Sequence, residues 1–247
     1  MFWAGQMAGI ASGTAGYAVD AADFDGTNDY MLRGAAWTGA ADANSGIFSC
    51  WFRLDGGDAA NRTFLYAAAG TQIYIDTSNK LQFAFGGAVS FNMASVSALT
   101  AGAPWRHALA SWNRGSATPQ LYIDDVSDVT IAANGTGPFT YTQANWGVGA
   151  DTAGPGGSKF NGCFAEFYLA LGQYLDFSTS ANRAKFRSGG KPVNLGGDGS
   201  VPTGTAPTAY FSILNGGAAA DFATNRGTGG NMTITGTLDI ASSSPSD

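Results

Sequence analysis

The sequence has few of the groups that carry out acid–base, nucleophilic or metal chemistry. Its 247 residues include one histidine, His107, two cysteines and a single glutamate, Glu166. A structural zinc site needs about four Cys or His ligands, and the three that are present are widely spread. No serine occupies a Gly-x-Ser-x-Gly elbow, and no glycine-rich phosphate loop follows a strand. These absences argue against an enzyme of any of these types.

Charge is also scarce. Charged residues make up 12% of the chain, about half of the roughly 25% that is typical of globular proteins. The 12 Lys and Arg residues are scattered and the net charge is -6, so we expect no nucleic-acid partner. The first basic residue is Arg33, and the N-terminus therefore lacks the positive region of a secretory signal. No run of about 18 apolar residues occurs, so we expect no membrane insertion.

The chain is instead rich in short segments that are typical of strands and turns. Hydrophobic residues reach 45%, and there are 36 glycines. Residues 105–126 predict a hairpin, because an alternating strand ending at Trp112 is followed by turn-forming residues 113–116 and a second strand at 121–124. Residues 47–54 carry large side chains on both faces, which predicts an inner strand that is covered on both sides.

Three stretches resemble the laminin-G and pentraxin group of domains. They are W-x-H followed by L-Y-I-D in residues 105–124, DFDGTNDYML in residues 23–32, and GCFAEFYLAL in residues 162–171. Domains of this group are jelly rolls of the concanavalin A-like lectin type. The resemblance therefore implies an all-β fold, an antiparallel two-sheet jelly-roll sandwich.

We expect one domain over residues 18–240, with the C-terminal strands completing the same sandwich. Residues 1–17 are predicted to form an arm that packs on its own domain or docks on a neighbouring subunit, and residues 241–247 a flexible polar tail. One short helix is predicted near residues 178–188, because a Ser or Thr cap precedes it and two glycines follow it. The expected core residues are Trp51, Phe83, Leu109, Ile123, Phe164 and Tyr168.

The resemblance also bears on catalysis and on metal binding. Retaining glucanases of this fold carry E-x-D-x-x-E on one strand, whereas the strand here reads AEFYLAL around Glu166, so the required pair of carboxylates is missing. Pentraxin-like domains bind calcium through an acidic loop, which here keeps only Asp151. Asp55 and Asp58 are the alternative ligands for a Ca2+ ion, and no other cofactor is expected. His107, in the middle of a strand, is predicted to be a hydrogen-bonded structural residue.

The cysteines are predicted to be free. Cys50 lies where pentraxins carry half of a disulfide, but Leu109 occupies the position of the family's partner cysteine. The remaining thiol, Cys163, lies on a later strand. Without an export signal, we expect two buried thiols that act as small apolar core residues.

A further resemblance bears on function. Residues 174–204 look like stretches of structural proteins of tailed bacteriophages. We therefore expect a non-enzymatic virion component (tail, fibre or capsid decoration) that is assembled in the host cytoplasm. Other virion proteins, copies of itself and host surface polysaccharide are its expected partners. The alternative is a soluble glycan-binding lectin module, in which sugars would stack on Trp37, Trp51 or Tyr141 in a surface groove.

Overall fold

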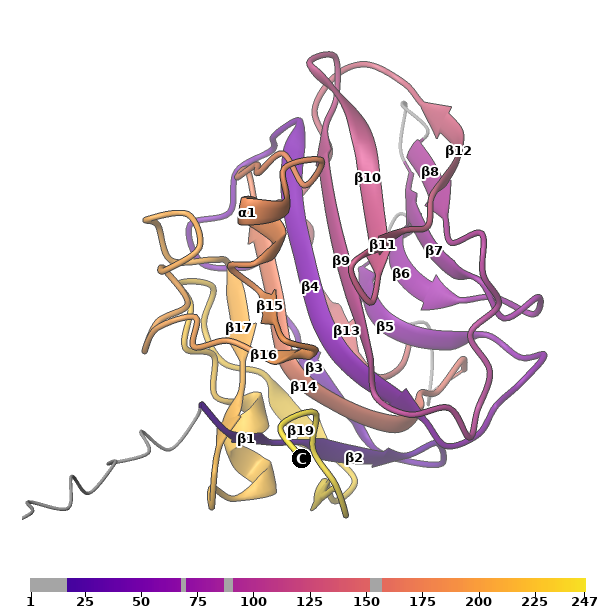
Figure 1. Cartoon of the computed structure of the whole chain (residues 1–247), viewed down its shortest axis with the longest axis vertical. Coiled ribbons are helices and arrows are strands. Elements are labelled where there is room, and N and C mark those ends of the chain that lie inside the picture. Colours follow the sequence, from indigo (N-terminus) through magenta and orange to yellow (C-terminus); the bar gives the residue numbers. More distant parts are fainter. Residues whose placement is uncertain (1–16, 68–69, 87–90, 152–156) are drawn as a thin grey trace, which may run out of the picture.

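The computed structural model describes residues 17–67, 70–86, 91–151 and 157–247, and it arranges them as two large antiparallel sheets that face one another (Figure 1). This confirms the predicted all-β jelly-roll sandwich. Among the described residues, no helix has the length and apolarity needed to cross a lipid bilayer. The predicted N-terminal arm lies outside the described residues except for Tyr17.

We call the two large sheets sheet I and sheet II. Sheet I runs in the order β11 (Val126–Ser127), β10 (Ala117–Ile123), β9 (Arg106–Asn113), β4 (Ser45–Leu54), β14 (Asn161–Leu171), β2 (Ala22–Asp25) and β20 (Asp239–Ile240), with β17 (Ala209–Phe211) also pairing with β14. Sheet II runs in the order β12 (Thr130–Asn134), β8 (Phe91–Ala94), β7 (Leu81–Phe85), β6 (Thr71–Ile75), β5 (Arg62–Ala67), β13 (Trp146–Val148), β3 (Tyr30–Arg33) and β19 (Thr233–Thr235). Two small ribbons pair β1 (Val19–Asp20) with β18 (Ile213–Leu214), and β15 (Arg187–Ser188) with β16 (Lys191–Pro192).

The main core lies between the two sheets and is rich in phenylalanine. On β4, alternate side chains such as Phe48 and Phe52 face sheet II, because successive side chains of a strand point to opposite faces. Three of the predicted core residues, Phe83, Ile123 and Phe164, belong to this cluster. The other three lie elsewhere, so the hydrophobic alternation of the strands did not by itself identify the face that sheet II covers.

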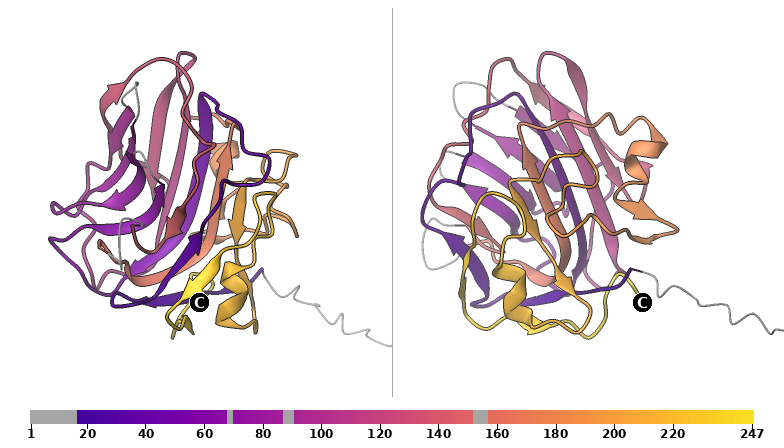
Figure 2. Two further views of the ribbon diagram at one scale, coloured as in Figure 1. Left: turned by 180° about the vertical axis from the view of Figure 1, so that it is seen from behind. Right: turned by 90° about the vertical axis from the view of Figure 1, so that its left-hand side faces the viewer.

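The outer face of sheet I is apolar as well. Leu109 and Tyr168 belong to a second buried cluster with Phe177 and Phe186, which follow β14 in the chain. Trp51 belongs to a third cluster, beside Val19 and Ala241. The other three predicted core residues are thus buried outside the sandwich core. Figure 2 shows the C-terminal segments, in orange and yellow, lying over this face of the sheet.

The predicted helix is much shorter than residues 178–188. The structure contains α1 (Ser180–Arg183), and β15 begins at Arg187. Gly189 and Gly190, which the sequence suggested as the helix stop, have positive φ angles of 58° and 81° and form the turn between β15 and β16. A 3-10 helix, η2 (Ala219–Ala223), occurs between β18 and β19.

Residues 241–247, which the sequence predicted as a flexible tail, lie against the domain. Ala241 and Ser244 are each 8% exposed. The Ser246 hydroxyl accepts a hydrogen bond from the Val19 amide at 3.0 Å, and the Ser243 hydroxyl accepts one from Arg53 at 2.6 Å. These contacts attach the segment to sheet I and to the N-terminal strand.

The centre of the main core should be sensitive to truncation at Phe64. Its ring centroid lies 5.1 Å from that of Phe52, 5.1 Å from that of Phe160 and 4.9 Å from that of Phe164. We expect Phe64→Ala to lower the free energy of unfolding by about 3–5 kcal/mol, because it removes buried apolar area and leaves a cavity. Urea denaturation measures this change. Val201→Ala, at a side chain that is 62% exposed, is the control and should change stability by less than about 0.5 kcal/mol. Equal effects of the two substitutions would contradict the assignment.

Candidate functional site

The three aromatic residues predicted to bind sugars are buried. Trp37 and Trp51 are each 2% exposed, and Tyr141 is 1% exposed. Trp51 stacks on His107 with ring centroids 4.7 Å apart, and the Tyr141 hydroxyl accepts a hydrogen bond from the Trp112 indole at 2.8 Å. A ring that is covered in this way has no free face for a sugar, so the prediction that these three rings stack on a glycan in a surface groove is wrong.

The three predicted metal ligands do not form one site among the described residues. Asp55 forms an ion pair with Arg53 at 2.8 Å, and Asp58 forms one with Arg62 at 3.0 Å. Asp151 follows β13, and the rest of the pentraxin-like loop, residues 152–156, lies outside the described residues. Asp55 and Asp58 each already have an arginine as their cation, which argues against the two of them as calcium ligands. A calcium site at the loop of Asp151 stays a prediction.

A different group of potential ligands lies beside sheet I. In the part of the chain that the structure describes, one oxygen each of Asp23 and Asp55 and the Cys163 sulfur all lie within 4.8 Å of one another. Arg53 donates to both oxygens of Asp55 at 2.8 Å and to the Cys163 sulfur at 3.3 Å. Burial and the neighbouring carboxylates raise the pKa of Cys163, which keeps the thiol protonated. We interpret this group as a structural cluster that Arg53 neutralises.

The two cysteines have different surroundings. Both are free and buried, as the sequence predicted. Cys50 belongs to the main core, and burial raises its pKa well above the ordinary value. Cys163 belongs to the apolar cluster that contains Trp51, and its sulfur also accepts a hydrogen bond from Arg53. Both thiols are thus buried in apolar clusters, as expected, and Cys163 has a polar partner in addition.

Glu166, the only glutamate, is 2% exposed on the outer side of sheet I. It lies at a bulge in the pairing of β14 with β4, and its φ angle is 49°. Its carboxyl group accepts hydrogen bonds from the hydroxyls of Tyr210, at 2.9 Å, and Ser212. Desolvation by burial raises its pKa to about 7, although these hydroxyls oppose the shift. A carboxyl group in this position holds segments together and does not face a ligand.

His107 is also enclosed, as its predicted structural role requires. It is 1% exposed, and its Nε2 atom lies 2.9 Å from the Ser49 hydroxyl oxygen. Burial, together with the charge of Arg187, lowers the pKa of His107 to about 3. The ring is therefore neutral at physiological pH and is stacked on Trp51.

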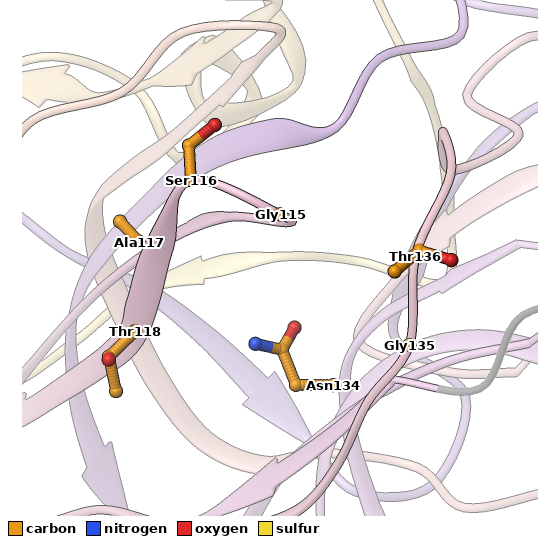
Figure 3. Close-up of a pocket in the computed structure, with 7 residues that line it drawn as sticks. All are labelled: Gly115, Ser116, Ala117, Thr118, Asn134, Gly135 and Thr136. Atoms are coloured by element: carbon orange, nitrogen blue, oxygen red, sulfur yellow. The ribbon is translucent and has the colours of Figure 1, made fainter.

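An open pocket lies at one end of the sandwich, where the β9–β10 turn faces the segment after β12 (Figure 3). Its volume is about 360 Å3. Figure 3 shows residues 115–118 on one wall and residues 134–136 on the other, with the Asn134 amide directed into the space between them. The lining consists of small or uncharged polar residues: Gly115, Ser116, Ala117, Thr118, Asn134, Gly135 and Thr136.

Arg114 joins the two walls of this pocket. It is 2% exposed, and its guanidinium donates to the backbone oxygens of Gly135 at 2.9 Å and Gly137 at 3.2 Å. The guanidinium also lies 4.4 Å from the ring centroid of Phe139. The arginine therefore holds the segment that follows β12 against the β9–β10 turn. Arg114 itself is not among the residues that line the pocket.

The side chains that line the pocket can form hydrogen bonds but carry no charge. Three hydroxyls (Ser116, Thr118 and Thr136) both donate and accept, and the Asn134 amide offers two donors and one acceptor oxygen. No titratable side chain is among the lining residues. The pocket suits an uncharged ligand that carries several hydroxyl groups. From the sequence, only Gly115 and Ser116 of this lining were interpreted, as turn formers, and the other lining residues were assigned no role.

Two antiparallel sheets with a neutral, hydroxyl-lined pocket at their rim define a lectin-like β-sandwich. A laminin-G-type family model, described as the concanavalin A-like lectin/glucanases superfamily, matches residues 25–170. The chain belongs to this superfamily.

Solved structures agree with this fold. One neighbour, from Bacteroides ovatus, is described as an inferred carbohydrate-binding protein; it has a TM-score of 0.63 and 14% identity, over 91% of this chain and 60% of its own length. A native heptameric SAP-like pentraxin from Limulus polyphemus has a TM-score of 0.51 and 10% identity, over 71% of this chain and 86% of its own. The chain thus spans less than two thirds of the bacterial protein. No curated protein sequence matches the chain.

The ionisation of Glu166 should make folding stability depend on pH. The folded-state pKa of about 7 lies above the value of roughly 4.3 for an unfolded glutamate. Between these values the unfolded chain binds fewer protons than the folded one, so the free energy of unfolding falls as pH rises. The full loss, roughly 4 kcal/mol, is reached above about pH 7 and is absent below about pH 4.

Glu166→Gln tests this prediction, because glutamine stays neutral at every pH. Urea unfolding of both proteins at pH 4.5 and pH 8 should show the variant gaining roughly 3 kcal/mol relative to the wild type as pH rises. Comparing the two proteins removes the contribution of His107, which acts in the opposite direction. Val201→Ala, which changes no titratable group at a side chain that is 62% exposed, is the control, and its pH profile should run parallel to that of the wild type. Parallel pH profiles for Glu166→Gln and wild type would contradict the assignment.

Proposed function

We propose that this protein is a non-catalytic, glycan-binding module, and that the pocket in Figure 3 holds an uncharged part of a polysaccharide. The observation that carries the proposal is the composition of the pocket lining, which includes Ser116, Thr118, Thr136 and Asn134 and no charged group, around about 360 Å3. The Asn134 amide is directed into this space (Figure 3). Sugar hydroxyls form hydrogen bonds with such groups without the cost of removing a charge from water.

Two further observations support binding without catalysis. Hydrolysis of a glycosidic bond requires two carboxyl groups that flank the bond, and the pocket lining has none. Glu166 and His107 are 2% and 1% exposed, so neither can reach a sugar in this pocket. The name of the bacterial structural neighbour refers to carbohydrate binding, which agrees with the proposal.

Asn134 is the most informative residue to change. Each hydrogen bond from its amide contributes about 1 kcal/mol, so Asn134→Ala should weaken glycan binding about fivefold to thirtyfold if one or two bonds are lost. A glycan array identifies the ligand, and calorimetric titration of the best ligand measures the dissociation constants of wild type and variant. Thr130→Ala is the matched control, because Thr130 is an exposed polar residue on the same strand outside the pocket.

Two outcomes would refute the pocket as the site. One is a glycan that binds Asn134→Ala as tightly as wild type, and the other is an array on which the wild-type protein binds nothing. Equal weakening by Asn134→Ala and Thr130→Ala would also count against it, because the effect would then not be specific to the pocket.

The biological setting that we propose is a bacteriophage virion, in which this module is a tail, fibre or capsid-decoration protein. Support comes from the resemblance of residues 174–204 to phage structural proteins and from the low share of charged residues, 12%. In that setting the module contacts other virion proteins or copies of itself, and its pocket contacts polysaccharide on the host surface.

Mass spectrometry of purified particles tests the virion setting. Particles from lysates of cells that express the gene, banded in a density gradient, should contain this protein at a constant ratio to the major capsid protein. The ratio should survive a high-salt wash, because a chain with so few charges would be retained mainly by apolar and hydrogen-bonded contacts. Recovery of the protein only in the soluble fraction would favour the alternative, a free lectin module.

A further inference from the structure

A second pocket lies at the opposite end of β9 from the one in Figure 3. It has a volume of about 310 Å3 and lies between the residues that precede β9, the β15–β16 turn and the segment 243–247. Eight residues of β9 separate the two pockets, which corresponds to roughly 26 Å along an extended strand. The lining residues that the argument uses are Trp105, Lys191 and Asp247.

Trp105 is held in place on the surface of this pocket. Its indole N–H donates to the Ser243 hydroxyl at 3.1 Å, and the Arg53 guanidinium lies 5.8 Å from the ring centroid. The ring is half-buried, in contrast to Trp51, which lines the same pocket at 2% exposure. A large flat ring that is already fixed loses little conformational freedom when an apolar surface packs against it. The C–H face of a pyranose is such a surface.

Lys191 and Asp247 have hydrogen-bonding capacity to spare. The Lys191 ammonium has three donors, and one of them is directed at the Ser246 backbone oxygen at 2.6 Å. The Asp247 carboxylate accepts from the Ser244 amide at 2.7 Å and from its hydroxyl at 3.4 Å, which leaves lone pairs on both oxygens. Within the described residues, no ion pair joins Lys191 to Asp247.

We propose that this pocket is a second sugar-binding site, which takes a pyranose whose ring packs on Trp105 and whose neighbouring hydroxyl groups bridge Lys191 and Asp247. Two adjacent hydroxyls can accept from the ammonium and donate to the carboxylate at the same time. The class of ligand, a sugar, is taken from the proposed function. The site is new, and its chemistry differs from that of the pocket in Figure 3. The two sites together would let one module hold two points of a polysaccharide, which raises its effective affinity.

The resonance of Trp105 reports on this pocket independently of the other one. Protein labelled with 5-fluorotryptophan is titrated with the methyl pyranosides of glucose, galactose, mannose and N-acetylglucosamine, and the Trp105 signal is assigned from its loss in Trp105→Phe. We expect at least one pyranoside to shift this signal. The same titration of Lys191→Ala should give an affinity at least about tenfold weaker.

The matched control is Lys185→Ala, because Lys185 is also an exposed lysine that donates to a single backbone oxygen, that of Pro202, at 2.9 Å. It should leave the titration unchanged. If the Trp105 signal does not move at about 50 mM of any of the four pyranosides, a concentration that would fill even a millimolar site, the inference is overturned. Equal effects of Lys191→Ala and Lys185→Ala overturn it as well.

Asn134→Ala separates this inference from the proposed function. A shift of the Trp105 signal that persists in Asn134→Ala supports the second site, whatever happens at the pocket in Figure 3. Glycan binding that depends on Asn134 without any shift at Trp105 overturns the second site and leaves the proposed function intact.

Discussion

The outer face of sheet I is the constraint on which the rest of the structure depends. The side chains of β4 and β14 are buried on both faces of sheet I along nearly the whole length of the two strands. Sheet II covers only one of these faces, so without another layer the apolar side chains of the other face would be exposed to water. The residues that follow β14 cover part of it with Phe177, Phe186 and Leu195. Residues next to β1 and β20 cover the rest. The C-terminal third of the chain is therefore part of this domain's core.

This cover explains the position of Glu166. A buried carboxyl group needs hydrogen-bond donors among the residues that cover it. Glu166 has two, the hydroxyl groups of Tyr210 and Ser212, which belong to the C-terminal part of the chain. The Tyr17 hydroxyl lies 3.3 Å from that of Tyr210, so the network also includes the N-terminal end of the described chain. A polar network of this kind specifies which segments meet, whereas apolar contacts alone would allow sliding.

The same cover decides where a ligand could bind. It encloses Trp51, and Trp105 with Lys191 lines an opening beside it. The pocket in Figure 3 lies at the turn between β9 and β10. Both pockets thus lie at ends of strands, on loops that a rigid sheet positions. The two pockets differ in chemistry, because the first has an uncharged lining of hydroxyls and an amide and the second has Trp105, Lys191 and Asp247.

The sequence by itself determined the fold class, because strand alternation and turn residues act over a few neighbouring positions. It also identified the W-x-H strand and the structural, hydrogen-bonded role of His107. Alternation distinguishes two faces of a strand but not what later covers each face, so Trp51 could be expected both in a core and on a surface. The helix near residue 180 was overestimated because Phe186 packs on Tyr168 and draws the chain into β15. The candidate pocket arises only in the tertiary structure, because Ser116 follows β9 of sheet I whereas Asn134 ends β12 of sheet II. Arg114 brings the two segments together through hydrogen bonds to Gly135 and Gly137 that no local pattern encodes.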